Sequence, residues 1–170
     1  ARAIIADCFK HREWIYWIDM ILSAAVGYGA ASIFFAAEAY SWRQIAAYLV
    51  AGFALFRLGS FIHEIVHMPG KTMRRFKIAW NLIAGIPLLM PSFFYGNHID
   101  HHSSKHYGTD QDGEYLPLGT GTLSQIFHFY LQVIFLPAFI FCRFFILTPL
   151  SAFSPKLRQF VLERCSSFVI

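Results

Sequence analysis

The stretch IAAYLVAGFALFRLGSFIHEIVH, from Ile45 to His67, decides the fold of this chain. Its first part, Ile45 to Ile62, is predominantly apolar. At about 1.5 Å of rise per residue it is long enough to cross most of a hydrocarbon core of roughly 30 Å. The run continues without a turn signal into His63 and His67, and the Pro69-Gly70 pair then ends the helix. The stretch therefore predicts a membrane-spanning helix that carries two histidines at its end.

An earlier apolar run, Ile15 to Ala37, is also long enough to form a span. Lys10 and Arg12 precede this run, and a segment rich in Lys and Arg, residues 71–77, follows the Ile45 stretch. Cytoplasmic loops of membrane proteins carry an excess of Lys and Arg. We therefore expect a two-helix hairpin with both ends in the cytosol and the link from Glu38 to Arg43 on the other side.

Two further apolar runs complete the pattern. Ile78 to Tyr95 is interrupted by Gly85, Pro87 and Pro91, which favours a re-entrant or interfacial segment over a clean span. Ile126 to Leu150 is expected to cross the membrane once. The predicted fold class is therefore all-α, an integral membrane helical bundle with a re-entrant or interfacial segment between two histidine clusters.

Some residues inside the spans leave alternatives open. Gly27 and Ala31 form a small-xxx-small step, which either lets a neighbouring helix approach or faces lipid without a special role. Arg57 and Arg143 lie within apolar runs, where a charge is costly and often functional. Each arginine either serves function or is satisfied by reaching the interface or by pairing with an acid.

The composition supports a protein that lies largely in lipid. Hydrophobic residues make up 56% of the chain and charged residues only 14%, whereas soluble domains carry about a quarter charged residues. The net charge of +4 does not indicate a nucleic-acid partner, because the basic residues gather at the ends of apolar runs. The cysteines are three, far apart and without a C-x-x-C pair, so neither a disulfide framework nor a zinc ribbon is expected.

Six of the eight histidines fall between His63 and His106, in two clusters. His63 and His67 are four residues apart and share one face of a helix. A single pair with this spacing is also common among surface and structural histidines. His11 and His128 have no partner in either pattern, and we expect both to be structural.

The second cluster is NHIDHH, residues 97–102. If this stretch is helical, the rings of His98, His101 and His102 project to one side. Neutral imidazole is the commonest metal ligand in proteins. The two clusters together therefore predict a metal site at the boundary between membrane and cytosol, with His106 as a candidate additional ligand.

The first cluster also reads H-E-x-x-H, the motif of zinc proteases in which two histidines bind zinc and the glutamate is the general base. A membrane-embedded zinc metalloprotease is therefore the alternative function. Besides the two histidines of this motif, a protease zinc needs only one more protein ligand. The three histidines of the second cluster exceed what a tetrahedral site with one open position can bind. Glu64 is then interpreted as a surface carboxylate, or one that orients an imidazole.

The motifs His63-x-x-x-His67 and His98-x-x-His101-His102 resemble the first and second histidine boxes of the membrane fatty acid desaturase and hydroxylase superfamily. The resemblance covers roughly residues 45–118. It implies an enzyme with two iron ions that uses O2 to desaturate or hydroxylate a fatty acyl or similar lipid chain. It also implies an electron donor such as cytochrome b5 or ferredoxin.

The resemblance further implies that the five boxed histidines are the iron ligands, and no catalytic residue beyond the ligands is assigned. The family has a third box, H-x-x-H-H or Q-x-x-H-H, whereas this chain has no histidine after His128. We therefore expect residues 1–170 to be the N-terminal portion of a single desaturase-like domain, inactive by itself, with the third box beyond Ile170. The boxes are expected on the cytosolic side.

Overall fold

The computed structural model describes residues 12–95, 98–109, 112 and 120–164. Across these ranges every regular element is helical and no strand occurs, as predicted. Three helices are long and apolar enough to cross a membrane: Glu13–Ala36, Trp42–His67 and Leu123–Ser151. The all-α membrane class is therefore confirmed. The chain divides after Leu88 into two compact units.

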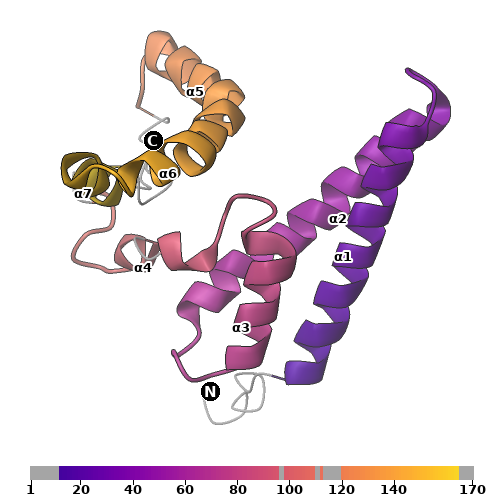
Figure 1. The fold of residues 1–170 in the computed structure, drawn as a ribbon, viewed down its shortest axis with the longest axis horizontal. Coiled ribbons are helices and arrows are strands. Elements are labelled where there is room, and N and C mark those ends of the chain that lie inside the picture. The colour runs from indigo at the N-terminus through magenta and orange to yellow at the C-terminus, as the bar shows by residue number, and fades with distance from the viewer. Residues whose placement is uncertain (1–11, 96–97, 110–111, 113–119, 165–170) are drawn as a thin grey trace. The chain divides into compact units, whose positions relative to one another are not determined.

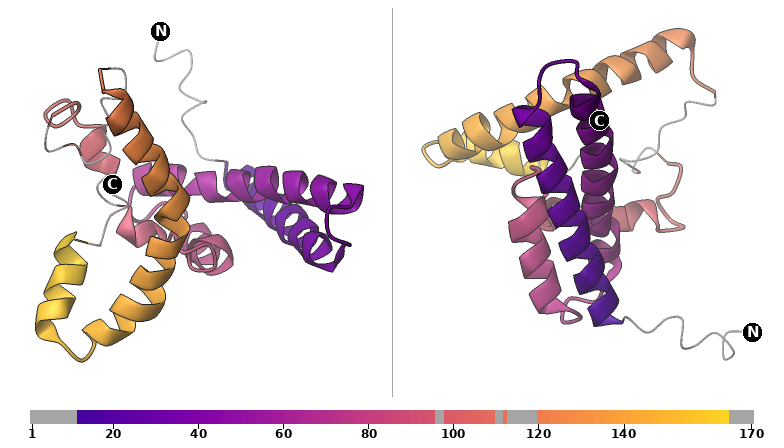
Figure 2. Two further views of the ribbon diagram at one scale, coloured as in Figure 1. Left: turned by 90° about the horizontal axis from the view of Figure 1, so that it is seen from above. Right: turned by 90° about the vertical axis from the view of Figure 1, so that its right-hand side faces the viewer.

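The first unit is built on a hairpin of two antiparallel helices, α1 (Glu13–Ala36) and α2 (Trp42–His67), which lie side by side (Figures 1 and 2). Ser41 is the N-cap of α2, and its side chain accepts a hydrogen bond of 3.2 Å from the Gln44 backbone N–H. Such a cap satisfies one of the free N–H groups at a helix start. α2 then runs through both predicted histidines to its C-cap, Met68, directly before the Pro69-Gly70 stop.

The two helices approach closely at Gly27. A Cβ atom at this position would lie 2.7 Å from Leu55 Cδ2 and 3.3 Å from the Leu55 backbone nitrogen. Of the two alternatives left open for the Gly27/Ala31 step, the structure has the close approach of a neighbouring helix at Gly27, and the neighbour is α2. Small residues dominate this buried contact, namely Ser23, Ala24 and Ala30 of α1 with Ala47 and Ala51 of α2.

An ion pair joins the two helices within their apolar length. The Arg57 guanidinium of α2 contacts the Asp19 carboxylate of α1. Ser23 donates a hydrogen bond of 3.1 Å to the same carboxylate. Arg57 also donates to the Ser60 hydroxyl at 3.1 Å and lies over the Phe61 ring, 4.7 Å from its centroid. Of the alternatives that the sequence leaves open for Arg57, the structure has the pairing with an acid.

A short helix, α3 (Arg74–Trp80), packs against the histidine-bearing end of the hairpin. Phe76 and Trp80 of this helix have no exposed surface. The Phe76 ring meets those of Tyr16 and Phe61 at centroid distances of 5.6 and 5.5 Å. The Trp80 indole donates a 2.8 Å hydrogen bond to the carbonyl of Leu58, in the middle of α2. α3 thereby ties the end of α2 to α1.

The segment after α3 is broken, as its glycine and prolines predict. It forms a π-helical turn, η2 (Asn81–Gly85), and later a single 3-10 turn, η3 (Ser92–Phe94). The Tyr28 hydroxyl of α1 donates a 2.6 Å hydrogen bond to the Ile83 carbonyl and so holds the π-helical turn to the hairpin. Between Met68 and Tyr95 no helix reaches a spanning length.

The second unit holds the remaining helices. They are α4 (His98–His101), α5 (Leu123–Phe141), a π-helical stretch η4 (Cys142–Leu147), α6 (Thr148–Ser151) and α7 (Pro155–Arg164). α5 to α6 form the third candidate span, and α5 has no buried residue. Arg143 in this span donates to the Thr148 hydroxyl and lies over the Phe144 ring at 5.3 Å. The Arg143 guanidinium is thus stabilised by a hydroxyl and an aromatic ring close to it in sequence.

The close approach at Gly27 generates a test with a built-in control. Gly27→Val should destabilise the hairpin by about 1–3 kcal/mol, because a new side chain meets the Leu55 backbone as well as its side chain. Gly29→Val makes the same change in helix propensity, but nothing lies within 4 Å of a Cβ there. Thermal unfolding in detergent should therefore show a lower melting temperature for Gly27→Val than for Gly29→Val. Equal melting temperatures would contradict the packing.

The hairpin also predicts that Ser41 and Lys71 lie on opposite sides of the membrane, because one spanning helix separates them. Single cysteines at these positions, in a background without the native cysteines, would be labelled by a membrane-impermeant maleimide in sealed vesicles. Only one of the two should react before the vesicles are opened. Labelling of both from the same side would show that α2 does not span.

Candidate metal centre

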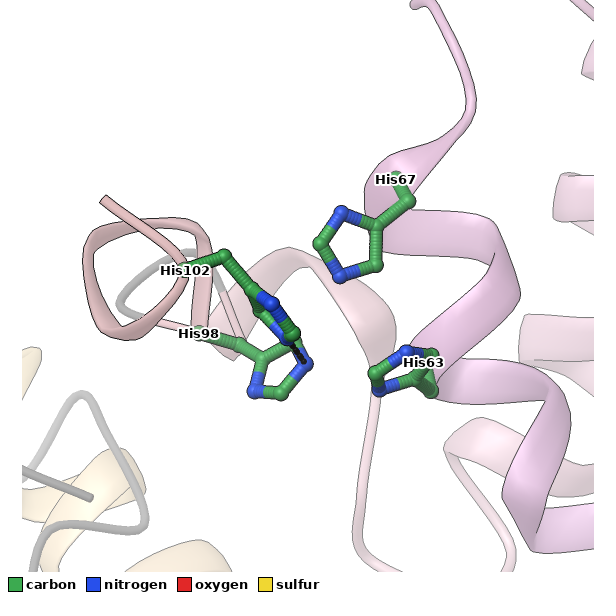
Figure 3. A group of neighbouring side chains, drawn as sticks. All are labelled: His63, His67, His98 and His102. Carbon is green, nitrogen blue, oxygen red and sulfur yellow. Dashed lines mark hydrogen bonds between the residues drawn. The ribbon is translucent and has the colours of Figure 1, made fainter. Parts of the chain in front are cut away.

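The first histidine pair projects from the last turns of α2. The ring centroids of His63 and His67 are 4.7 Å apart, and both side chains are exposed (Figure 3). The neighbouring residues Ile62 and Ile65 are buried instead. One face of the helix end is thus fixed by packing, while the other presents two imidazoles on successive turns.

The C-terminal end of α2 is held by Lys77 of α3. The Lys77 ammonium donates hydrogen bonds to the carbonyls of Met68, at 2.9 Å, and Pro69, at 3.0 Å. The last carbonyls of a helix lack partners within the helix, and a cation there also interacts favourably with the helix dipole. Burial lowers the pKa of Lys77 from its usual value. The first histidine pair therefore sits on a helix end whose position is fixed.

Glu64, between the two histidines, is engaged by α1. The Tyr16 hydroxyl donates a hydrogen bond of 3.2 Å to Glu64 Oε2, and the Glu64 side chain is exposed. Glu64 is thus the surface carboxylate that the sequence suggested as one interpretation. The contact ties the histidine-bearing turn of α2 to the start of α1.

The second pair belongs to the other unit. His98 begins the single turn of α4, and His102 follows its last residue. The Nε2 atoms of these two residues are 3.0 Å apart (Figure 3). His98 is buried and stacks on the Tyr95 ring, with a centroid distance of 4.7 Å and an interplanar angle of 11°. The Tyr95 ring therefore covers one face of the His98 ring and fixes its plane, while His98 Nε2 faces His102 Nε2.

The arrangement of His98 and His102 fits a metal ion. Two nitrogens bound at about 2.1 Å to one ion, at right angles to each other, would be about 3.0 Å apart. Each residue in the two pairs offers one ring nitrogen as a ligand atom. Imidazole nitrogens suit zinc, copper, iron and nickel, so the donor set alone does not select the metal.

His101 is paired with a buried carboxylate. Its Nδ1 lies 2.9 and 3.0 Å from the two carboxylate oxygens of Asp112, whose side chain has no exposed surface. The His101 ring centroid is 5.9 Å from that of His98 and 5.4 Å from that of His102. The three rings thus lie close together, and His101 differs from the other two in that its Nδ1 is paired with a carboxylate. Its role as a metal ligand stays a prediction.

The remaining histidines are less closely linked to these pairs. His106 is half-buried in the turn that follows, where its carbonyl accepts a 2.6 Å hydrogen bond from the Thr109 hydroxyl. Its candidacy as a ligand stays a prediction. His128 Nδ1 is 2.7 Å from the Ser124 carbonyl, one turn earlier on α5, which fits the predicted structural role. His11 and Asn97 lie outside the described residues.

Residues 40–165 match a protein family described as fatty acid desaturase. The chain belongs to this family. It is also 36% identical to a ceramide hydroxylase from Caulobacter vibrioides (strain NA1000 / CB15N), over 100% of this chain and 48% of that protein. The chain thus spans about half the length of the curated relative it matches. No solved structure matches it.

Membership of the fatty acid desaturase family confirms the resemblance drawn from the two histidine boxes. Together with the three spanning helices it makes the chain part of an integral membrane protein. It also favours the oxidoreductase over the zinc protease, since the H-E-x-x-H motif falls inside the matched residues.

Sequence reasoning missed three residues that shape this site: Tyr16, Tyr95 and Asp112. Tyr16 reaches Glu64 across 48 positions of sequence, and no periodicity predicts such a contact. Tyr95 is three residues before His98, so helical spacing offered a weak signal for their stacking. Asp112 is one of several acids in a polar stretch, and nothing in the sequence distinguishes it from its neighbours.

The geometry of the second pair predicts a loss of metal binding upon its removal. In the full-length protein, His98→Ala should weaken Co²⁺ binding by more than about 100-fold. Loss of a residue that only hydrogen-bonds to a ligand costs about 10- to 100-fold in metal affinity, and loss of a ligand itself should cost more. His128→Ala is the matched control and should bind Co²⁺ as the wild type does. The measurement is a competition titration against a chromogenic chelator. Equal affinity in His98→Ala and His128→Ala would remove His98 from the metal site.

Proposed function

We propose that this protein is a membrane iron enzyme that hydroxylates or desaturates the acyl chain of a lipid, using O2 and electrons from a redox donor. The proposal rests on the two histidine pairs, each built into its own helical frame, in a chain of the fatty acid desaturase family. Within the proposal, residues 1–170 belong to a single desaturase-like membrane domain.

The proposed ligands of two iron ions are the five boxed histidines, His63, His67, His98, His101 and His102, with His106 as a candidate addition. Iron is chosen over other metals because of the family, since imidazole alone does not discriminate. Bound iron would activate O2, the oxidant, for attack on an unactivated C–H bond, which no acid–base side chain can achieve. The protein supplies orientation and a dry environment for that chemistry.

The residues around the pairs have definable roles in this proposal. Lys77 and Trp80 fix the end of α2, so that His63 and His67 keep their spacing. Tyr95 covers one face of His98 and excludes water from it. The histidines of α2 lie where an apolar span meets the basic segment 71–77, which we assign to the cytosolic boundary. A lipid chain could therefore reach them from the bilayer, and a redox donor from the cytosol.

The proposed substrate class is supported by the relative's name. A ceramide hydroxylase shares 36% identity across this chain, which favours hydroxylation of a ceramide-like lipid over desaturation of a free fatty acid. Because one oxygen atom of O2 ends as water, the reaction consumes electrons. Cytochrome b5 or a ferredoxin would be donors of the required kind.

The alternative function, a zinc metalloprotease, is favoured by one observation, the H-E-x-x-H spacing of His63, Glu64 and His67. The two functions assign different roles to Glu64. In a protease it would be the general base, and its loss would reduce turnover by about 10²–10⁴-fold while zinc stays bound. In the proposed oxidoreductase it accepts a hydrogen bond from Tyr16 and at most orients a histidine ligand, without transferring a proton.

Glu64→Gln therefore separates the two functions. The full-length protein in membranes, supplied with an electron donor and a ceramide substrate, should retain measurable oxidation of the acyl chain in this variant, with a loss of about 10- to 100-fold at most. His63→Ala should abolish both iron binding and turnover. Product is measured by mass spectrometry and metal by elemental analysis. Stoichiometric zinc without iron, with proteolysis lost in Glu64→Gln, would favour the protease instead.

A further inference from the structure

Asp112 is a buried carboxylate beside the second histidine box. Its side chain has no exposed surface, and both oxygens lie within hydrogen-bonding distance of His101 Nδ1, at 2.9 and 3.0 Å. Oδ2 also accepts a 3.0 Å hydrogen bond from the Gly108 backbone N–H. Burying a carboxylate is unfavourable unless it is paired and hydrogen-bonded. These contacts are therefore what allow it to be buried here.

The loop is folded so that this contact can form. Asp112 lies 11 residues after His101, and the chain returns through successive turns. In these turns Thr109 N–H donates to the His106 carbonyl, and Asp112 N–H donates to that of Thr109. Gly108 has a φ of +72°, a left-handed conformation that glycine adopts without steric cost. That conformation aims the Gly108 N–H at the Asp112 carboxylate.

The contact fixes the chemistry of the His101 ring. An ionised carboxylate can only accept hydrogen bonds, so Nδ1 must carry the proton. In the neutral ring the lone pair is then on Nε2, the nitrogen on the other side. His98 and His102 face each other through Nε2 as well. The three histidines of the box can therefore all bind metal through the same ring nitrogen.

We propose that Asp112 is a positioning residue that holds His101 in the Nδ1-protonated form, with Nε2 as its metal-binding nitrogen. The inference rests on the proposed function, because it takes the iron site as given, and it names a residue outside the two histidine motifs. Carboxylates that accept from the second nitrogen of a metal-bound imidazole fix its orientation and raise its basicity. Asp112 acts through His101 and does not itself touch the metal.

Asp112→Asn is the discriminating variant. The amide is nearly isosteric and can still accept from Gly108 N–H, but it is neutral and can rotate to donate to Nδ1, which moves the ring proton to Nε2. Full-length protein without metal would be titrated anaerobically with Fe²⁺ against a chromogenic chelator. Asp112→Asn should bind Fe²⁺ about 10- to 100-fold more weakly than the wild type. Its Co²⁺ absorption spectrum should also change, since that spectrum reports the ligand set.

Two controls separate positioning from a structural role. Glu38→Gln neutralises an exposed acid in the α1–α2 link and should leave Fe²⁺ affinity unchanged. Adding Asp112→Asn to His101→Ala should cause no further loss of affinity, because residues that act through one another are not additive. The metal-free forms of wild type and Asp112→Asn should melt at the same temperature.

The outcomes are distinguishable. Wild-type Fe²⁺ affinity in Asp112→Asn, or an equal loss in the His101→Ala background, would overturn the inference and leave the proposed function intact. A lower melting temperature of metal-free Asp112→Asn, with His101→Ala unaffected, would assign Asp112 a structural role and overturn it as well. A wild-type protein that binds no Fe²⁺ would refute the proposed function and the inference together.

Discussion

The hydrogen bond from the Trp80 indole to the Leu58 carbonyl is the interaction on which the histidine-bearing end of α2 depends. Both residues are fully buried, so the indole N–H would be left without a hydrogen-bond acceptor if the Leu58 carbonyl did not accept from it. The bond sets the register of α3 along α2. That register in turn places Lys77 at the last carbonyls of α2 and Phe76 against Tyr16. The geometry of His63 and His67 follows from these contacts rather than from the histidines themselves.

Charged groups in this apolar chain are matched to partners that suit their surroundings. Asp19 and Arg57 pair with each other along the spanning hairpin, where a single charge would be costly. Lys77 finds two carbonyls at a helix end. The Asp112 carboxylate accepts hydrogen bonds from an imidazole N–H and a backbone N–H. The same rule of local compensation thus operates in the span, at its end and in the polar loop.

Much of the fold could be predicted from the sequence, because the signals were long and periodic. The expected spans Ile15 to Ala37 and Ile45 to Ile62 correspond to α1 and α2, and α2 runs on through both histidines. The break near Gly85 was also predicted, although not its form. A π-helical turn held by Tyr28 depends on a contact between distant residues, which leaves no local pattern.

The candidate site was predictable in its residues but not in their orientation. Spacing alone placed His98 and His102 together, and the structure agrees. The same spacing brings the His101 ring near the other two, at centroid distances of 5.9 and 5.4 Å, but it could not predict that His101 Nδ1 pairs with Asp112. The fold of an irregular loop, rather than periodicity, decides that contact.

The closeness of the helices at Gly27 bears on how a lipid could travel to the histidines. Leu55 already fills the space beside Gly27, so the seam between α1 and α2 is closed to an acyl chain. Phe53 and Phe56, by contrast, are exposed on the outer side of α2. Under the proposed function, a lipid chain would therefore not pass between the two helices at Gly27, and the exposed aromatic side chains of α2 are the ones available to contact it from the bilayer.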